Sequence, residues 1–125
     1  VAEVRDELGQ AMERAARAGV SREAIVLDPG IGFAKHAGQS YEVLAGLREL
    51  AALGRPLLVG PSRKSFLQAA AGERPAAERD WGTAAAVTAA ILGGAHVVRV
   101  HAVAEMVQVA RVADAIRLAG RPGAR

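Results

Sequence analysis

Acidic and basic side chains stand at the ends of three short apolar runs of the sequence. The runs are AIVLD (24–28), PLLVG (56–60) and HVVRVH (96–101). Asp28 ends the first run, Lys64 follows the second within PSRKS, and Arg99 and His101 end the third. Two basic groups side by side suit an anion such as phosphate. The residue types therefore predict a site for an anionic small molecule.

Each of these residues also has a purely structural interpretation. Asp28 precedes Pro29 and Gly30 and could form a turn. Lys64 could begin an exposed helix, although the helix dipole disfavours a lysine there. Arg99 needs an anionic partner or water, because an unpaired buried charge is costly. A histidine alone is more often structural, and His36, His96 and His101 have no spacing that predicts a metal site. Ser62 and Ser65 are typical helix caps.

The three apolar runs predict the strands that position these groups. Each run is short, rich in β-branched residues and bounded by Gly or Pro. Successive runs lie about thirty residues apart or more, as in βαβ units, which predicts a parallel sheet with right-handed crossovers. In such sheets ligands bind at the carboxyl ends of the strands. Alternation places Arg99 and His101 on one side of their strand, with Val98 and Val100 on the other.

Helical patterns separate the strands. An N-terminal helix would end at Gly19, a single helix would cover 41–54, and a short helix would run from Lys64 to Ala71. Asp80 would cap the next helix, which ends at Gly93. The last helix would turn a common face to the core: Met106, Val109, Ala113 and Ile116. The fold is predicted as α/β, either a section of a (β/α)₈ barrel or a small doubly wound sheet. The absence of GxGxxG counts against a dinucleotide fold.

The composition excludes several classes of protein. Hydrophobic residues make up 51% of the chain and charged residues 23%, which is typical of a packed globular domain. The chain has no cysteine, which excludes disulfides and thiolate chemistry and fits a reducing, cytoplasmic location. The net charge is +3, but the arginines are scattered and aromatics are scarce, so we expect no nucleic-acid partner. No segment predicts a membrane span or a signal peptide. The first residues are already helical in pattern, so we expect the chain to start inside a larger protein.

Four motifs together resemble the dihydropteroate synthase family of folate biosynthesis. They are LDPGIGFAK (27–35), VGPSRKSF (59–66), RDWGTAAAV (79–87) and VRVH (98–101), in the family's order and near its spacing. The resemblance covers essentially the whole chain but matches only the C-terminal half of the family's (β/α)₈ barrel. It implies that residues 1–125 are the C-terminal half of a pterin-binding domain, with three parallel strands each followed by a helix.

The resemblance implies a reaction and its ligands. The family condenses 6-hydroxymethyl-7,8-dihydropterin diphosphate with 4-aminobenzoate to give 7,8-dihydropteroate and diphosphate, assisted by Mg²⁺. Asp28 would accept hydrogen bonds from the pterin, Lys64 would donate to it, and Gly60 would let the ring approach the backbone. Arg99 would lie over the pterin and, with His101, hold the diphosphate.

For the second substrate, Ser65 would bind the aminobenzoate carboxylate and Phe33 would form part of its wall. Lys64, Arg99 and His101 are the expected catalytic residues. The family also implies a homodimer and a target for sulfonamides.

This sequence departs from the family pattern in what it lacks. The family's N-terminal signature loop, its early pterin ligands and its metal-binding asparagine are absent, and Pro61 stands where Ala or Thr is expected. We therefore expect about half a site, no metal ligand among these residues, and no turnover by this chain alone.

Two other functions remain open. One is a pterin-binding domain that passes a methyl group to a corrinoid, and tighter pterin binding with diphosphate would argue against it. The other is a non-catalytic half-barrel that acts by association with another chain, since open sheet edges invite pairing. A lone monomer with a normal melting transition would argue against the second.

Overall fold

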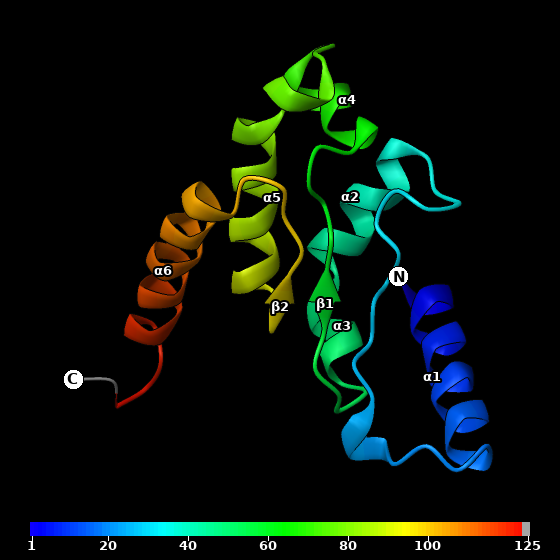
Figure 1. Cartoon of the computed structure of the whole chain (residues 1–125). Helices are drawn as coiled ribbons and strands as arrows, with labels where there is room; N and C mark the ends of the chain where they lie inside the picture. The colour runs from blue at the N-terminus through cyan, green and yellow to red at the C-terminus, as the bar shows by residue number, and fades with distance from the viewer. Residues whose placement is uncertain (124–125) are drawn as a thin grey trace.

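The computed structural model describes residues 1–123, and its centre is a small parallel sheet (Figure 1). Strand β1 (Leu58–Val59) pairs in parallel with β2 (Val97–Val98). On the other side of β1, Leu27 forms a single parallel bridge with Leu57. The order of the three segments across the sheet is therefore their order along the chain, and all three run in the same direction.

The first predicted strand, 24–28, is wrong as a strand. Arg22–Ala24 forms the 3-10 turn η1, and only Leu27 bridges to its neighbour. Within residues 1–123 this segment has a hydrogen-bonding partner on one side only, and Val26 is half exposed. The other two predicted strands are confirmed in place, but each is only two residues long.

Helices follow each extended segment and pack beside one another. Their bounds are α1 (Ala2–Arg17), α2 (Ala37–Ala45), α3 (Leu47–Ala51), α4 (Gln68–Ala71), α5 (Asp80–Leu92) and α6 (Val103–Ala119), with 3-10 turns η2 (Ser65–Leu67) and η3 (Ala76–Glu78). α6 packs on α5, α5 on α2, and α1 on α3, an order visible from left to right in Figure 1.

Gly19, with a φ of +93°, ends α1 as predicted. No helix among the described residues is both long and apolar enough to cross a membrane.

The single helix predicted over 41–54 is wrong, because Gly46 divides it into α2 and α3. The side chain of Val1 occupies the space beside Gly46, where a Cβ atom would lie 2.6 Å from a Val1 methyl carbon. Real Cβ contacts are essentially never that short, so a side chain at position 46 would have to displace Val1. This long-range contact has no signature in the local sequence.

Two apolar clusters hold the layers together. The larger one joins the strands to α2 and α3, with Leu47, Leu50, Leu57 and Val59 all fully buried. Each such side chain contributes about 1.5–3 kcal/mol by leaving water. The smaller cluster joins α5 to α6, and Val98 and Val100 pack against it. The predicted alternation along the third run is thus confirmed for its two valines.

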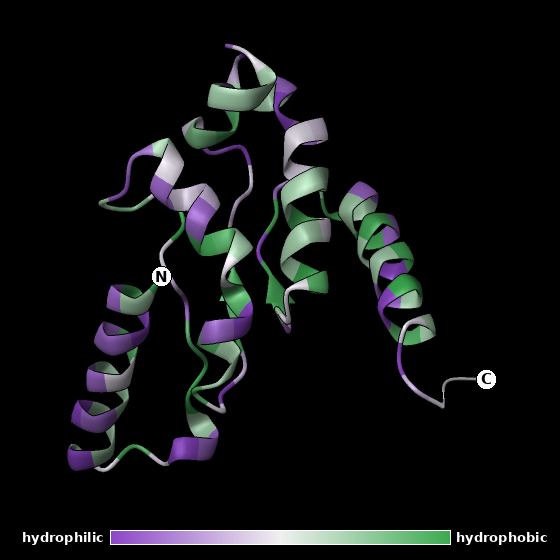
Figure 2. Cartoon of the chain, turned by 180° about the vertical axis from the view of Figure 1, so that it is seen from behind, coloured by the Kyte–Doolittle hydropathy of each residue, from purple (hydrophilic) through white to green (hydrophobic). Residues whose placement is uncertain are grey.

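The predicted core face of α6 is confirmed only in part. Met106 and Ala113 are buried and Val109 is half buried, but Ile116 is 55% exposed. Ile116 lines an open apolar groove between α5 and α6 and is not enclosed by them. Figure 2 shows hydrophobic residues along α6 from end to end.

Candidate active site

The loops that follow the three parallel segments lie at one end of the sheet, the upper end in Figure 1. They bring Asp28 and Arg99, 71 residues apart in the chain, into contact: Arg99 Nη1 donates to Asp28 Oδ2 at 3.4 Å. Lys64 lies close enough for both charges to act on its ammonium group. Three of the four predicted polar residues are therefore neighbours at the carboxyl ends of the strands.

Gly60 provides the space in which the Arg99 guanidinium lies. A Cβ atom on Gly60 would be 2.5 Å from Arg99 Nη2 and 2.9 Å from Cζ. The backbone of Arg99 is fixed by its N–H, which donates to the carbonyl oxygen of Val59 at 3.0 Å. The predicted close approach at Gly60 is thus made here by the protein's own guanidinium.

Asp28 serves the turn and the charge cluster together. Its Oδ1 accepts a hydrogen bond from the backbone N–H of Gly30 at 2.8 Å, so the turn-forming interpretation is correct. Its Oδ2 faces Arg99. Gly30 and Gly32 have φ values of +70° and +81°, which favour glycine, and they fold the loop back over the site. Because a carboxylate offers about four lone pairs, both oxygens keep acceptor capacity for a ligand.

The Lys64 side chain runs along this loop. Its Cδ would lie 2.9 Å from a Cβ on Gly32, and its Nζ donates to the carbonyl oxygen of Ile31 at 2.6 Å. The same Nζ is 4.5 Å from the centroid of the Phe33 ring, a cation–π contact. Burial lowers the pKa of Lys64, the Arg99 charge lowers it further, and Asp28 opposes the shift. Two ammonium hydrogens remain for a ligand.

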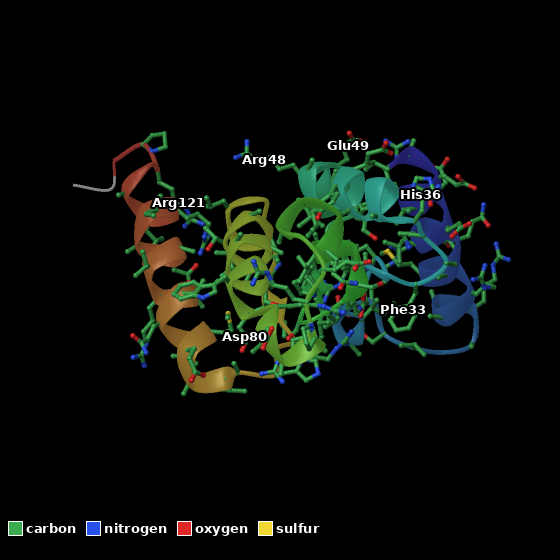
Figure 3. All side chains as sticks on the ribbon, turned by 90° about the horizontal axis from the view of Figure 1, so that it is seen from above. Phe33, His36, Arg48, Glu49, Asp80 and Arg121 are labelled. Atoms are coloured by element: carbon green, nitrogen blue, oxygen red, sulfur yellow. The ribbon has the colours of Figure 1, made fainter. Side chains whose placement is uncertain are left out.

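Phe33 and Ser65, the two residues predicted to contact 4-aminobenzoate, are both open to solvent. Phe33 is 64% exposed, and Figure 3, which looks onto the end of the sheet where the strand-end loops lie, labels it. Ser65 is exposed and begins η2, with no side-chain cap. Ser65 follows Lys64 directly, so the two side chains start from adjacent positions. Their proposed contacts with a ligand stay predictions.

His101 is held by a different partner from the other three. Its Nδ1 is 2.6 Å from Ser62 Oγ, and its backbone N–H donates to the same oxygen at 3.0 Å. Ser62 is buried, and neither hydrogen bond is a helix cap, so its interpretation as a cap is wrong. Within the described part of the chain, no hydrogen bond joins His101 to Asp28, Lys64 or Arg99. Local sequence could not reveal this pair, since its members are 39 residues apart.

Arg63 ties the loop between Ser62 and Lys64 to the start of α5. Its Nε donates to Asp80 Oδ1 at 2.9 Å and its Nη2 to Oδ2 at 3.1 Å. Its backbone N–H donates to Thr83 Oγ1, and its carbonyl oxygen accepts from Arg79 Nη1. The φ of Arg63 is +57°, an unusual value for a residue with a side chain, so these contacts hold a strained turn.

The prediction that Asp80 caps α5 is therefore wrong. Asp80 is the first residue of the helix and makes no capping bond, because its carboxylate is turned toward Arg63. The hydrogen bond from Arg63 is the main cause of a lowered pKa at Asp80. The local sequence does not reveal the pair of Arg63 and Asp80, since an acid at a helix start is by itself only a capping signal.

The remaining histidines are structural, as predicted. His36 Nδ1 accepts from the backbone N–H of Gln39 at 3.4 Å and caps α2, and Figure 3 labels it away from Asp80. His96 Nδ1 accepts from the backbone N–H of Leu57 at 3.3 Å. Across residues 1–123, no three His, Cys, Asp or Glu side chains come together as metal ligands would.

Comparisons with known proteins agree with this geometry. A sequence profile described as "Pterin binding enzyme" matches residues 1–101. The dihydropteroate synthase of Synechocystis sp. is 49% identical over 116 residues, which are 93% of this chain and 40% of that protein. A structure of Xanthomonas albilineans dihydropteroate synthase in complex with 7,8-dihydropteroate superposes with a TM-score of 0.91 and 35% identity, over 98% of this chain and 46% of that one.

A Yersinia pestis dihydropteroate synthase structure with a sulfonamide drug complex gives a TM-score of 0.90 at 36% identity, over 94% of this chain and 43% of that one. This chain thus spans less than half the length of each of these three proteins.

Proposed function

Because the chain belongs to the pterin-binding enzyme family, we propose that it acts in folate synthesis as part of a dihydropteroate synthase. The reaction joins 6-hydroxymethyl-7,8-dihydropterin diphosphate to 4-aminobenzoate and releases diphosphate. One observation carries the proposal: Asp28, Lys64 and Arg99, from three separate loops, form a single cluster at the carboxyl ends of parallel strands.

The cluster has the hydrogen-bonding groups that a pterin needs. A carboxylate accepts two parallel hydrogen bonds, so Asp28 matches a ring N–H beside an exocyclic amine. Lys64 offers its two remaining ammonium hydrogens to the acceptor atoms of the same ring. The Phe33 ring beside the ammonium supplies an apolar wall for 4-aminobenzoate, and the Ser65 hydroxyl is the proposed partner of its carboxylate.

The reaction requires stabilisation of an anion and does not require a nucleophilic side chain. Diphosphate leaves from a methylene group on an electron-rich ring, while the arylamine attacks the same carbon. Arg99 and His101 stabilise the negative charge that develops on the departing oxygen. The loops hold both side chains in place before the reaction. This lowers the entropic cost of bringing the reacting groups together.

Across residues 1–123 no three His, Cys, Asp or Glu side chains come together, so no Mg²⁺ ligand is assigned to these residues. We therefore attribute no step to the metal in this chain, and the magnesium requirement implied by the family stays a proposal.

The wider architecture is part of the proposal. The order of the parallel segments along and across the sheet supports the C-terminal half of a (β/α)₈ barrel, as do the TM-scores with the synthase structures. A chain that spans 40% of its Synechocystis relative would hold only part of the site and would form no dihydropteroate alone. A homodimer, a cytoplasmic location and sulfonamide binding complete the proposal. The apolar groove between α5 and α6 supports the first, and the Yersinia pestis complex supports the last.

The relatives favour the synthase over the alternatives, because those compared above are named for this reaction and none for methyl transfer. A non-catalytic association module predicts that the chain exists only in complexes. A monomer with a normal melting transition in size-exclusion chromatography and calorimetry would exclude that module.

Titration calorimetry with a pterin diphosphate analogue tests the proposal. We expect the chain to bind the analogue and Lys64→Ala to bind it roughly 10- to 150-fold more weakly, since a hydrogen bond to a charged group contributes about 1.5–3 kcal/mol. Arg111→Ala, which removes an exposed charge from α6, is the matched control and should bind as the unaltered chain does.

Two results would contradict the proposal. One is a chain that is folded by circular dichroism yet does not bind the analogue. The other is Lys64→Ala binding as tightly as the control. Steady formation of dihydropteroate by this chain alone would contradict only the claim that it holds part of the site.

A further inference from the structure

Ser62 and His101 are joined by two hydrogen bonds that end on one oxygen atom. Ser62 Oγ lies 3.0 Å from the backbone nitrogen of His101 and 2.6 Å from Nδ1 of its ring. Ser62 is only 6% exposed, so water has little access to its hydroxyl. The histidine side of the pair is exposed. The Nδ1 edge of the imidazole is thus bonded to a buried hydroxyl, although His101 as a residue is exposed.

The hydrogen atoms of this pair can be assigned by counting donors and acceptors. A serine hydroxyl has one hydrogen and two lone pairs. One lone pair accepts the backbone N–H of His101. If Nδ1–H donated to the second lone pair instead, the hydroxyl hydrogen would have no acceptor among residues 1–123, where both side-chain hydrogen bonds of Ser62 are made to His101. The contacts therefore favour Nδ1 as the acceptor for that hydrogen. A neutral imidazole carries its single hydrogen on the other nitrogen, Nε2.

We propose that Ser62 is a positioning residue that holds His101 in the tautomer with hydrogen on Nε2, so that Nε2–H donates to the leaving diphosphate. The tautomer rests on the two contacts and on the lack of another acceptor for the hydroxyl hydrogen among residues 1–123, whereas the diphosphate as acceptor rests on the proposed function. A neutral donor has a consequence for the chemistry: His101 can bind the anion without first taking up a proton.

The backbone contact makes the positioning specific. Because the ring and the main chain of His101 bind one hydroxyl, both the orientation of the imidazole and the path of the chain after β2 depend on Ser62. The carbonyl oxygen of His101 accepts from the N–H of Val103, which links the same residue to the start of α6. Loss of the hydroxyl would therefore free the ring to rotate and to exchange its hydrogen between the two nitrogens.

Nitrogen-15 NMR of the imidazole rings tests the tautomer directly. The chain is labelled with ¹⁵N-histidine and measured above about pH 8, where histidine is normally neutral. We expect Nδ1 of His101 to be unprotonated and Nε2 to carry the hydrogen, and the signal to be assigned by its loss in His101→Gln. In Ser62→Ala the two tautomers should mix, and Ser62→Thr, which keeps a hydroxyl, should restore the preference.

His36 and His96 are internal controls in the same spectrum. The Nδ1 of each accepts from a backbone N–H, so Ser62→Ala should leave their signals unchanged. A general loss of folding would alter all three histidines and would be recognised at once. Ser62→Thr then provides the folded comparison that keeps the test decisive.

Three results would overturn the inference. Hydrogen on Nδ1 of His101 in the unaltered chain is the first, and an unchanged His101 spectrum in Ser62→Ala is the second. The third is covalent labelling of Ser62 by a fluorophosphonate, which would make the serine a nucleophile activated by the imidazole.

The role toward diphosphate is measured separately, by titration of the pterin diphosphate analogue. Ser62→Ala should weaken binding roughly 3- to 10-fold, and Ser62→Thr should recover it. If the NMR result holds but the analogue does not bind even the unaltered chain, the proposed function fails while the tautomer stands. If the analogue binds the unaltered chain, Ser62→Ala and Ser62→Thr with equal affinity, the positioning role toward the anion is wrong.

Discussion

Gly60→Ala should reduce ligand binding while leaving the fold almost unchanged. The added Cβ would lie 2.5 Å from Arg99 Nη2, whereas ordinary contacts begin near 3.4 Å, so the guanidinium must move by about 1 Å. Its contact with Asp28 is already 3.4 Å long, and a further displacement of that size abolishes a hydrogen bond. The three atoms nearest to the added Cβ all belong to Arg99, so the perturbation acts first on that side chain.

The cost to stability should be small, because several minor effects nearly cancel. The Arg99 side chain is 56% exposed and can move into solvent, and an ion pair of that kind contributes less than about 1 kcal/mol. Gly60 does not have a positive φ, so alanine fits the backbone and stabilises the fold by about 0.4–1 kcal/mol through the unfolded state. We expect the free energy of unfolding to change by less than about 1 kcal/mol. The loss of one charge-assisted hydrogen bond should weaken the pterin diphosphate analogue roughly 10- to 150-fold.

A double-mutant cycle decides whether the effect passes through Arg99. Calorimetry and urea denaturation are carried out on Gly60→Ala, Arg99→Ala and the double variant. The reasoning is refuted if Gly60→Ala weakens binding as much in the Arg99→Ala background as in the unaltered chain, because the methyl group would then exclude the ligand itself. A drop of more than about 2 kcal/mol in unfolding free energy would also refute it. Gly9→Ala in α1, whose Cβ would meet only Leu53 at 3.9 Å, is the control for adding a methyl group.

Two ionisable residues give predictions that depend on pH. Burial lowers the pKa of Lys64 in the folded chain. Between that folded pKa and the ordinary lysine pKa of about 10.4, the unfolded chain therefore binds more protons than the folded chain. The free energy of unfolding consequently rises with pH across that window. Lys64→Met should lose this rise in urea denaturation, and an unchanged slope would disprove it. The pKa of Asp80 is also lowered in the folded chain. For an acid, a lowered pKa stabilises the fold above the unfolded pKa, and this stabilisation is lost as the pH falls through the folded pKa. Asp80→Asn should therefore lower the urea midpoint more at about pH 7 than at about pH 2, and equal losses at both values would contradict the ion pair.

Patterns that depend on neighbouring residues were predicted well. The alternation of Val98 and Val100 with Arg99 and His101 follows from strand geometry, and in the structure the two valines are partly buried against the α5–α6 cluster, as expected. The rule that ligands meet the carboxyl ends of parallel strands was enough to group Asp28 with Lys64 and Arg99. These inferences need only periodicity and strand direction, which a sequence carries locally.

Features that depend on contacts between distant residues could not be predicted. Val1 packs beside Gly46 where α2 and α3 are divided, and Asp80 fails to cap α5 because Arg63 binds its carboxylate. The local sequence predicts Ser62 as a helix cap, but its hydroxyl instead bonds His101. For Ser62 and Asp80 the local preference was reasonable, but each side chain instead bonds a partner many residues away.

The turn at Arg63 also has an evolutionary consequence. Its ion pair with Asp80 joins a strained backbone to a helix, and its chain neighbours Ser62 and Lys64 are both proposed to serve the site. Loss of either charge alone would leave the other without its partner and release the turn under both neighbours. We therefore expect positions 63 and 80 to change together among natural homologues, and single replacements at either one to be rare even though neither side chain is proposed to touch a substrate.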